Sequence, residues 1–194
     1  MPATPVIQCD CGRECPVTNT VHALAVGTFA PILRTLSALL DKGAEHAAAA
    51  GQKADTLAAA RLAPDMFPLS GQVRVACREA VRTVALLTGH EAPAMEEGGT
   101  RLADLKDLIA RSVVDLESVP PAAFDGAEQR EVTLSLQQGM VLQLDGLAFL
   151  RDWALPQFYF HVVTAYDILR HHGVAIGKRD YMRHAGYAIR RTAG

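Results

Sequence analysis

Apolar residues recur every three or four positions along most of this chain, and that spacing constrains the fold more than any other feature. Residues at i, i+3, i+4 and i+7 share one face of a helix, so a sustained pattern predicts an amphipathic helix. Such patterns follow Asn19 as far as Gly51, and they recur over residues 66–87 and 102–119. A shorter pattern over residues 55–63 stops at Pro64, because proline disfavours helix in the residue before it.

Single residues add detail to these helices. Pro31 is expected near the first turn of the first helix or at a kink, because a proline deeper inside removes a hydrogen bond and clashes with the preceding turn. Thr100 is expected to cap the third helix. Cys77 falls on the apolar stripe of the second helix, which predicts a small buried side chain rather than a reactive thiol.

The fourth long segment, residues 146–171, is apolar nearly all round. Asp145 is placed to cap its start and Gly173 to close its end. A helix of this kind is buried in a core or covered by a partner. We therefore expect it to be the most buried element of the fold or to lie at a dimer interface.

Just before that segment the hydrophobic period changes to two. Val132, Leu134 and Leu136 alternate with polar residues, and the alternation resumes over residues 140–144 after Gln138-Gly139. Alternation on both sides of a glycine-containing turn predicts a β-hairpin. Four long helices and one small hairpin together predict an all-α fold, a four-helix bundle with a β-hairpin before the last helix.

Composition narrows the class of protein. Hydrophobic residues make up 49% of the chain, which argues against disorder. The net charge of −2 gives no general attraction to nucleic acid or to an anionic membrane. No run of about 18 uninterrupted apolar residues predicts a membrane span, and the start lacks the pattern of a secretory signal. We expect a cytoplasmic protein that binds neither nucleic acid nor membrane.

The two ends of the chain differ from the middle. Cys9, Cys11 and Cys15 crowd the start, in a spacing that departs from the paired clips of structural zinc sites. Residues 170–194 contain six Lys and Arg residues and one acidic residue, which gives this segment a net charge of +5. Because the whole chain carries −2, the rest of it carries −7. We predict a disordered extension over residues 1–19, a helical domain over 20–181 and a basic tail over 182–194.

His161 is the first candidate functional residue. Gln157 precedes it by four positions, and this spacing puts both side chains on one face of the last helix. Two interpretations stay open: a buried His–Gln hydrogen-bonded pair, or a pair that faces a substrate or a metal. The neighbouring histidines His171 and His172 fall at the helix end, where positive charge is favourable, and a ligand role there is the lesser alternative.

Asp65 is the second candidate. It lies where the second long helix should begin, so it is either the N-cap of that helix or a group that acts at the open end of the bundle. Arg61, four residues earlier, is a potential ion-pair partner, although Pro64 interrupts the helix between them.

Two motifs then resemble a bacterial and fungal family of domains of unknown function. One is RLAPDMFPL at residues 61–69; the other is PQFYFH at 156–161, followed by TAYDILR at 164–170 and by GV at 173 and GKRD at 177. That family is similar to the DinB/YfiT-like four-helix bundles. Members of this wider group bind a divalent metal through one His on the second helix and an H-x3-H pair on the fourth. Some are thiol-dependent transferases or hydrolases, and many form dimers.

The resemblance implies a metal site in a changed form. His161 matches the second member of the histidine pair, Gln157 stands in place of the first, and Asp65 lies near the position of the second-helix ligand. Glutamine is a much poorer zinc ligand than imidazole. The cofactor is therefore left open between a divalent metal (Zn²⁺, Ni²⁺ or Mn²⁺) and none.

Two classes of function follow. The first is a DinB-like enzyme or binder of a small molecule or divalent metal, with its site at one end of the bundle among Asp65, Gln157, His161 and Tyr166, and with His161 and Asp65 as the catalytic pair. Without a metal, His161 is the group able to act as acid or base at neutral pH. The second is a non-catalytic bundle that works as a homodimer or partner-binding module through its last helix.

Overall fold

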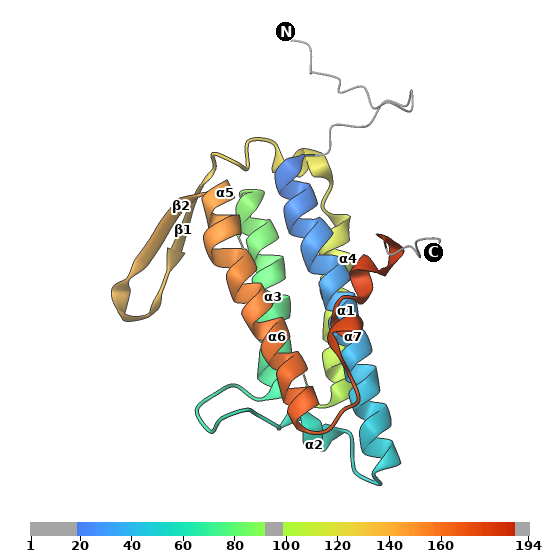
Figure 1. The fold of residues 1–194 in the computed structure, drawn as a ribbon. Helices are drawn as coiled ribbons and strands as arrows, with labels where there is room; N and C mark the ends of the chain where they lie inside the picture. Colours follow the sequence, from blue (N-terminus) through green and yellow to red (C-terminus); the bar gives the residue numbers. More distant parts are fainter. Residues whose placement is uncertain (1–18, 92–98, 189–194) are drawn as a thin grey trace, which may run out of the picture.

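The computed structural model describes residues 19–91 and 99–188. Four long helices run roughly along one direction in Figure 1: α1 (Thr20–Ala49), α3 (Leu69–Leu87), α4 (Leu102–Ser118) and α6 (Leu155–His171). Their apolar stripes meet in one core, which contains Phe29, Leu36, Leu105 and Phe158 at no more than 1% exposure. The predicted all-α bundle is confirmed.

Helix α1 is capped at its N-terminus by Asn19. The Asn19 side chain accepts hydrogen bonds from the backbone N–H groups of Val21 and His22, both at 3.1 Å, which satisfies two donors of the first turn. Of the two positions expected for Pro31, the first turn is excluded, because this residue lies well inside the helix. The residue four positions earlier, against whose carbonyl the proline ring would press, is Gly27, with no side chain to add to the crowding.

Helix α1 also has the length and composition of a membrane-spanning helix, with a mean hydropathy of 1.6 over its most apolar window. The sequence expectation concerned an uninterrupted apolar run, and it is not contradicted, because polar residues such as His22 and Arg34 interrupt this helix. More than half of that window is buried inside the bundle, against α3, α4 and α6. Burial of this kind accounts for the apolar composition, since a core helix needs an apolar surface as much as a membrane helix does.

The segment between α1 and α3 differs from the prediction. Helix α2 covers only Asp55–Ala58, and α3 begins at Leu69 rather than near Met66. Pro68 occupies the N-cap position, so Asp65 is not the cap of α3 and lies instead in the turn before it. The start of α3 is held by the backbone N–H of Leu69, which donates to the carbonyl of Ala60 at 2.8 Å.

Helix α4 begins one residue later than its predicted cap would place it. Arg101, not Thr100, is the N-cap, and the Asp104 carboxylate accepts its backbone N–H at 3.2 Å. An acidic group in the first turn is favourable because the helix N-terminus carries partial positive charge.

The hairpin consists of β1 (Glu131–Ser135) and β2 (Val141–Asp145), paired antiparallel with Val132 opposite Leu144. Its turn uses positive φ angles at Gln138 (60°) and Gly139 (75°). The hairpin stands to one side of the bundle in Figure 1, and Val132 and Leu134 are both buried. The predicted hairpin is confirmed.

The last helical segment is not a continuous α-helix. It consists of α5 (Gly146–Ala148), a π-helical turn (Phe149–Ala154) and α6, which begins just before Pro156. Proline lacks an N–H and crowds the preceding turn, and a wider turn is one way to relieve both. Gly146 is required at the entry, because a Cβ there would overlap the Ala127 carbonyl oxygen.

Of the two alternatives expected for this last helix, the most buried element of the fold is wrong, and a dimer interface stays a prediction. Seven of the 17 residues of α6 are buried, against 13 of the 19 residues of α3. Three neighbouring apolar side chains of α6 remain on the surface, Tyr159, Phe160 and Val163, at 36%, 57% and 39% exposure. Within the described chain, α3 is thus the more buried helix, and α6 keeps one uncovered apolar face.

The middle of the interface between α3 and α4 is buried. Cys77 is fully buried there, and desolvation raises the pKa of its thiol to about 12, against a smaller opposing effect of the Ser112 hydroxyl beside it. The Ser112 hydroxyl donates to the Leu108 carbonyl at 2.9 Å. Cys77 is a small buried side chain, as the sequence predicted.

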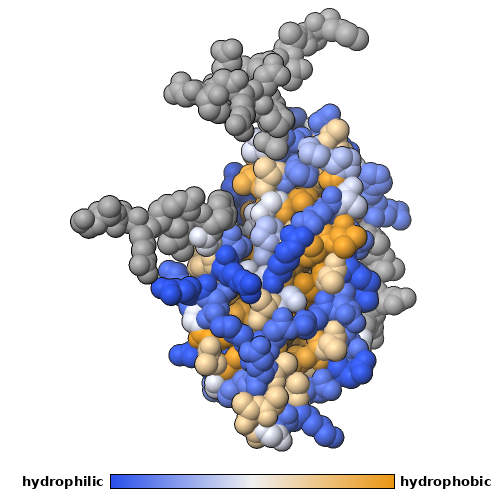
Figure 2. Space-filling model, turned by 90° about the vertical axis from the view of Figure 1, so that its right-hand side faces the viewer, coloured by the Kyte–Doolittle hydropathy of each residue, from blue (hydrophilic) through white to orange (hydrophobic). Residues whose placement is uncertain are grey.

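The C-terminal segment returns along α1. Helix α7 (Lys178–Tyr181) is followed by a 3-10 segment (Arg183–Ala188), and both contact α1. Asp180 pairs with Lys42 of α1 at 2.6 Å. Figure 2 shows this side of the molecule, where hydrophilic side chains predominate and smaller apolar patches lie between them. Residues 182–188 thus pack on the domain, whereas Cys9, Cys11 and Cys15 lie outside the described residues.

Candidate functional site

The candidate site lies where α3 and α6 pack side by side (Figure 1). The helices run in opposite directions, so the first turn of α3 lies beside the middle of α6. Gln72 projects from α3 and His161 from α6, at 1% and 9% exposure. A polar pair therefore interrupts an otherwise apolar helix–helix contact.

Two hydrogen bonds fix the orientation of both side chains. The Gln72 amide N–H donates to the Phe67 carbonyl at 3.2 Å, so the Gln72 oxygen faces His161. That oxygen lies 2.7 Å from His161 Nδ1. An amide oxygen can only accept, so Nδ1 carries the hydrogen and donates it. In the neutral imidazole this leaves the lone pair on Nε2.

The surroundings of His161 favour that neutral form. Burial lowers the pKa of His161 below its ordinary value, and the positive charge of Arg78 lowers it further. Arg78 lies on α3 and is itself exposed, with its guanidinium 3.4 Å from the Glu79 carboxylate. At neutral pH His161 is thus an uncharged base with a defined tautomer, within the electrostatic influence of a cationic group.

The structure does not bring Asp65 to this pair through any hydrogen bond within the described chain. Asp65 is exposed in the turn before α3. Arg61, predicted as its ion-pair partner, instead donates to the backbone carbonyls of Pro64 and Met66 at 3.3 and 3.1 Å. Those two bonds shape the turn around Asp65 without neutralising its carboxylate.

The other predicted site residues are also placed separately. Gln157 is half-buried, one turn before His161 on α6, but the glutamine bound to His161 is Gln72. Tyr166 packs its ring edge-on against Tyr181 of α7 at 6.1 Å between ring centroids. His171 and His172 are exposed at the end of α6.

Sequence reasoning missed Gln72 and Arg78. Gln72 was detectable as a polar residue three positions after Leu69 and four before Ala76, both of which are fully buried. Arg78 carried no such signal, because an exposed arginine on a helix is ordinary. Its significance comes from its electrostatic effect on His161, which depends on the packing of α3 on α6.

The residues here do not suit a divalent transition metal. Within residues 19–91 and 99–188, no three His, Cys, Asp or Glu side chains gather closely enough to hold a metal ion. The donors beside His161 are amides, which are weak ligands for Zn²⁺ and Ni²⁺. The positive charge of Arg78 would in addition oppose a cation at Nε2.

Comparison with known proteins places the chain in a family. A crystal structure of a DinB family member protein from Shewanella denitrificans is 37% identical, with a TM-score of 0.78, over 85% of this chain and 93% of that one. The family model described as a domain of unknown function, DUF1993, matches residues 21–182. The chain belongs to the DUF1993 family. Comparison with curated proteins gives no match.

The DUF1993 match includes α1, α3, α4, the hairpin and α6, and therefore both members of the Gln72–His161 pair. The resemblance inferred from the RLAPDMFPL and PQFYFH segments is confirmed at the level of this family and of the DinB-like bundles.

Proposed function

We propose that this DUF1993 protein binds a small organic molecule where α3 meets α6, and that Nε2 of His161 accepts a hydrogen bond from it. The observation that carries the proposal is the chain of hydrogen bonds from Phe67 through Gln72 to His161 Nδ1. It commits Nδ1 to the protein and leaves Nε2 as an acceptor. Histidines that bind metals or substrates are held by the same kind of outer hydrogen bond.

Arg78 supports a ligand that also carries negative charge. Its positive charge acts on the titration of His161, so it contributes to the electrostatic potential that a ligand at Nε2 would experience. A small weak acid with a hydroxyl or N–H donor fits this pair of requirements. Nε2 would also accept a proton from such a molecule, which is the one catalytic step that these residues supply.

The test uses three matched probes that differ in one group each. 4-Hydroxybenzoate carries both the donor and the charge, its methyl ester lacks the charge, and 4-methoxybenzoate lacks the donor. We expect 4-hydroxybenzoate to bind most tightly and to shift the ¹⁵N resonance of His161 Nε2. His161→Gln should abolish this preference, whereas His171→Gln, which changes an exposed histidine of the same helix, should leave it intact.

Two results would overturn the proposal. One is equal binding of the three probes, or no binding, in both the wild type and His161→Gln. The other is stoichiometric uptake of Zn²⁺, Ni²⁺ or Mn²⁺ that is lost in His161→Gln, which would replace the small molecule with a metal.

The uncovered face of α6 favours a second candidate, a homodimer or partner-binding module. Tyr159, Phe160 and Val163 are exposed neighbours on one side of this helix. Sedimentation of the native chain should then give a dimer that Phe160→Ser dissociates. Val114→Ser, at an apolar position of α4 that is 66% exposed, is the matched control and should leave the dimer intact. A monomeric wild type would contradict this candidate.

A further inference from the structure

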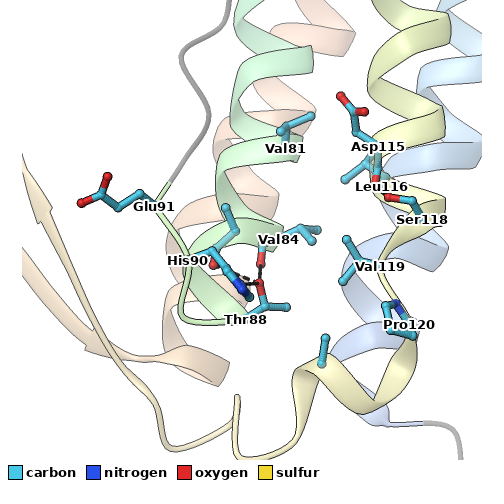
Figure 3. A pocket seen from close by; sticks show the side chains of 12 residues that line it. Val81, Val84, Thr88, His90, Glu91, Asp115, Leu116, Ser118, Val119 and Pro120 are labelled. Atoms are coloured by element: carbon cyan, nitrogen blue, oxygen red, sulfur yellow. Dashed lines mark hydrogen bonds between the residues drawn. The ribbon is translucent and has the colours of Figure 1, made fainter.

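A cavity lies at the opposite end of α3 from Gln72. It has a volume of about 390 Å³ and lies between the C-terminal ends of α3 and α4 and residues 119–123. Figure 3 shows the two helices facing each other across it, with Val81 and Val84 on one side and Leu116 and Val119 on the other. The volume falls within the range of about 300–1,000 Å³ that is usual for small-molecule sites.

The walls of this cavity are mainly apolar, and its charged lining residues are acidic. Asp115 and Glu91 are among them, although Figure 3 shows the Glu91 carboxylate directed away from the space between the helices, and neither Lys nor Arg is among the described residues that line it. The last turns of α3 and α4 end beside the same space, and helix C-termini carry partial negative charge. The electrostatic environment therefore favours a cation.

His90 lies beside Thr88 at one end of the cavity. The Thr88 hydroxyl oxygen lies 2.9 Å from the Val84 carbonyl, 3.1 Å from the Ala85 carbonyl and 3.0 Å from His90 Nδ1. These contacts hold the imidazole at this end of the cavity.

We propose that this cavity is a binding site for a small hydrophobic amine. The hydrocarbon part would lie against Val81, Val84 and Leu116, and the ammonium group would face Asp115. The carboxylate accepts hydrogen bonds, and an ammonium is a donor only. This site is separate from the one containing His161 and takes a ligand of the opposite charge.

Three molecules of one shape and different charge test the proposal: 2-naphthylmethylamine, 2-naphthylmethanol and 2-naphthoate. We expect the amine to bind about tenfold more tightly than the alcohol, since a carboxylate near the surface stabilises a cation by this order. The acid should bind most weakly. Chemical shifts of the methyl groups of Val84, Ala85 and Val119 should report contact with the naphthalene ring.

Variants assign the effect to this cavity. Asp115→Asn should bring the affinities of the amine and the alcohol within threefold of each other. Asp107→Asn, at an exposed acidic position of the same helix, should leave them unchanged. Ala123→Phe should fill the cavity and weaken all three ligands. Because Asp115 is exposed, its variant tests the charge preference even if the larger phenylalanine disturbs the fold.

The proposal fails if 2-naphthoate binds as tightly as the amine, if Asp115→Asn leaves the preference for the amine unchanged, or if none of the three molecules binds. His161→Gln should have no effect on these affinities, so this result is independent of the fate of the function proposed for the α3–α6 site.

Discussion

Helix α3 packs against α4 on one side and against α6 on another, and each interface contains one buried titratable group, Cys77 or His161. The two groups differ in their exposure and in their hydrogen bonds. Toward α4, helix α3 buries Cys77, with no exposed surface, next to the Ser112 hydroxyl. Toward α6 it buries Gln72 against His161, which keeps 9% of its surface exposed and lies within the electrostatic influence of a cationic side chain. Both groups are uncharged at neutral pH, because burial penalises the charged form of each.

The difference between the interfaces lies in what remains available for chemistry. The Cys77 thiol is closed off by packing, and its raised pKa keeps it protonated and unreactive. His161 donates a hydrogen bond from Nδ1 to Gln72, and its Nε2 keeps a lone pair. Burial alone therefore does not identify a functional group; the useful sign is burial combined with a fixed donor and an uncommitted acceptor.

The largest expected effect is a difference in unfolding free energy between variants of the two interfaces. Gln72→Leu leaves the His161 Nδ1 hydrogen and the Phe67 carbonyl without their partner, and should cost about 1–3 kcal/mol of unfolding free energy. Ser112→Ala should cost less than about 1 kcal/mol of unfolding free energy, because the Leu108 carbonyl does not need the hydroxyl as its hydrogen-bond partner. Urea unfolding of the two variants measures both.

A double variant sharpens that result. Gln72→Leu combined with His161→Phe removes both polar partners, and an apolar pair of similar size should restore part of the lost stability. Equal losses for Gln72→Leu and Ser112→Ala would mean that the two interfaces do not differ as described.

The next prediction concerns acid. The folded-state pKa of His161 is lowered from 6.5, so the unfolded chain binds a proton more readily. The resulting stabilisation is fully present above pH 6.5 and is lost as the pH falls toward the lowered value. Melting temperatures between pH 8 and pH 5 should therefore fall less in His161→Gln than in wild type. In His171→Gln the acid dependence should equal that of wild type.

Cys77 should act at the alkaline end. Its pKa is raised from 9.0 to about 12 in the folded chain, so the stabilisation is present below pH 9 and is lost between about pH 9 and 12. Cys77→Ala should flatten the loss of stability above pH 9 relative to wild type. Cys15→Ala serves as a control. If Cys77→Ala left the loss of stability above pH 9 unchanged, the burial of Cys77 between α3 and α4 would be contradicted.

The smallest predicted effect is on the titration of His161 itself. Arg78→Ala removes a positive charge, so the pKa of His161 should rise. It should stay below 6.5, because burial is the larger cause of the shift and is unchanged. Titration of the imidazole by NMR measures this, with Arg82→Ala as a control on the same helix. A fall in the pKa on removal of Arg78 would be inconsistent with this arrangement.

Much of the fold could be predicted because it depends on local patterns. The period of 3.6 located the long helices, and the Gln138-Gly139 turn located the hairpin. The start of α3 and the π-helical turn could not be located in this way. Both depend on prolines, Pro68 and Pro156, whose effect on the backbone is settled by what the neighbouring turns pack against.

The site was predicted only in its central residue. His161 stood out as a histidine within an apolar helix, but its partner was expected four residues earlier, at Gln157. The actual partner comes from a helix 89 positions away in sequence. Spacing along one helix reveals neighbours on that helix, whereas a contact across two helices depends on their relative rotation, which single-sequence periodicity leaves undetermined.

The bond from Gln72 to the Phe67 carbonyl links the loop before α3 to the proton of His161. A movement of this loop that withdrew the carbonyl would let the amide turn over, and an N–H would then face Nδ1. The imidazole would have to carry its hydrogen on Nε2 instead. The position of the Phe67 carbonyl thus determines whether Nε2 of His161 carries a lone pair or a hydrogen. A movement of the loop would therefore change the tautomer of this histidine.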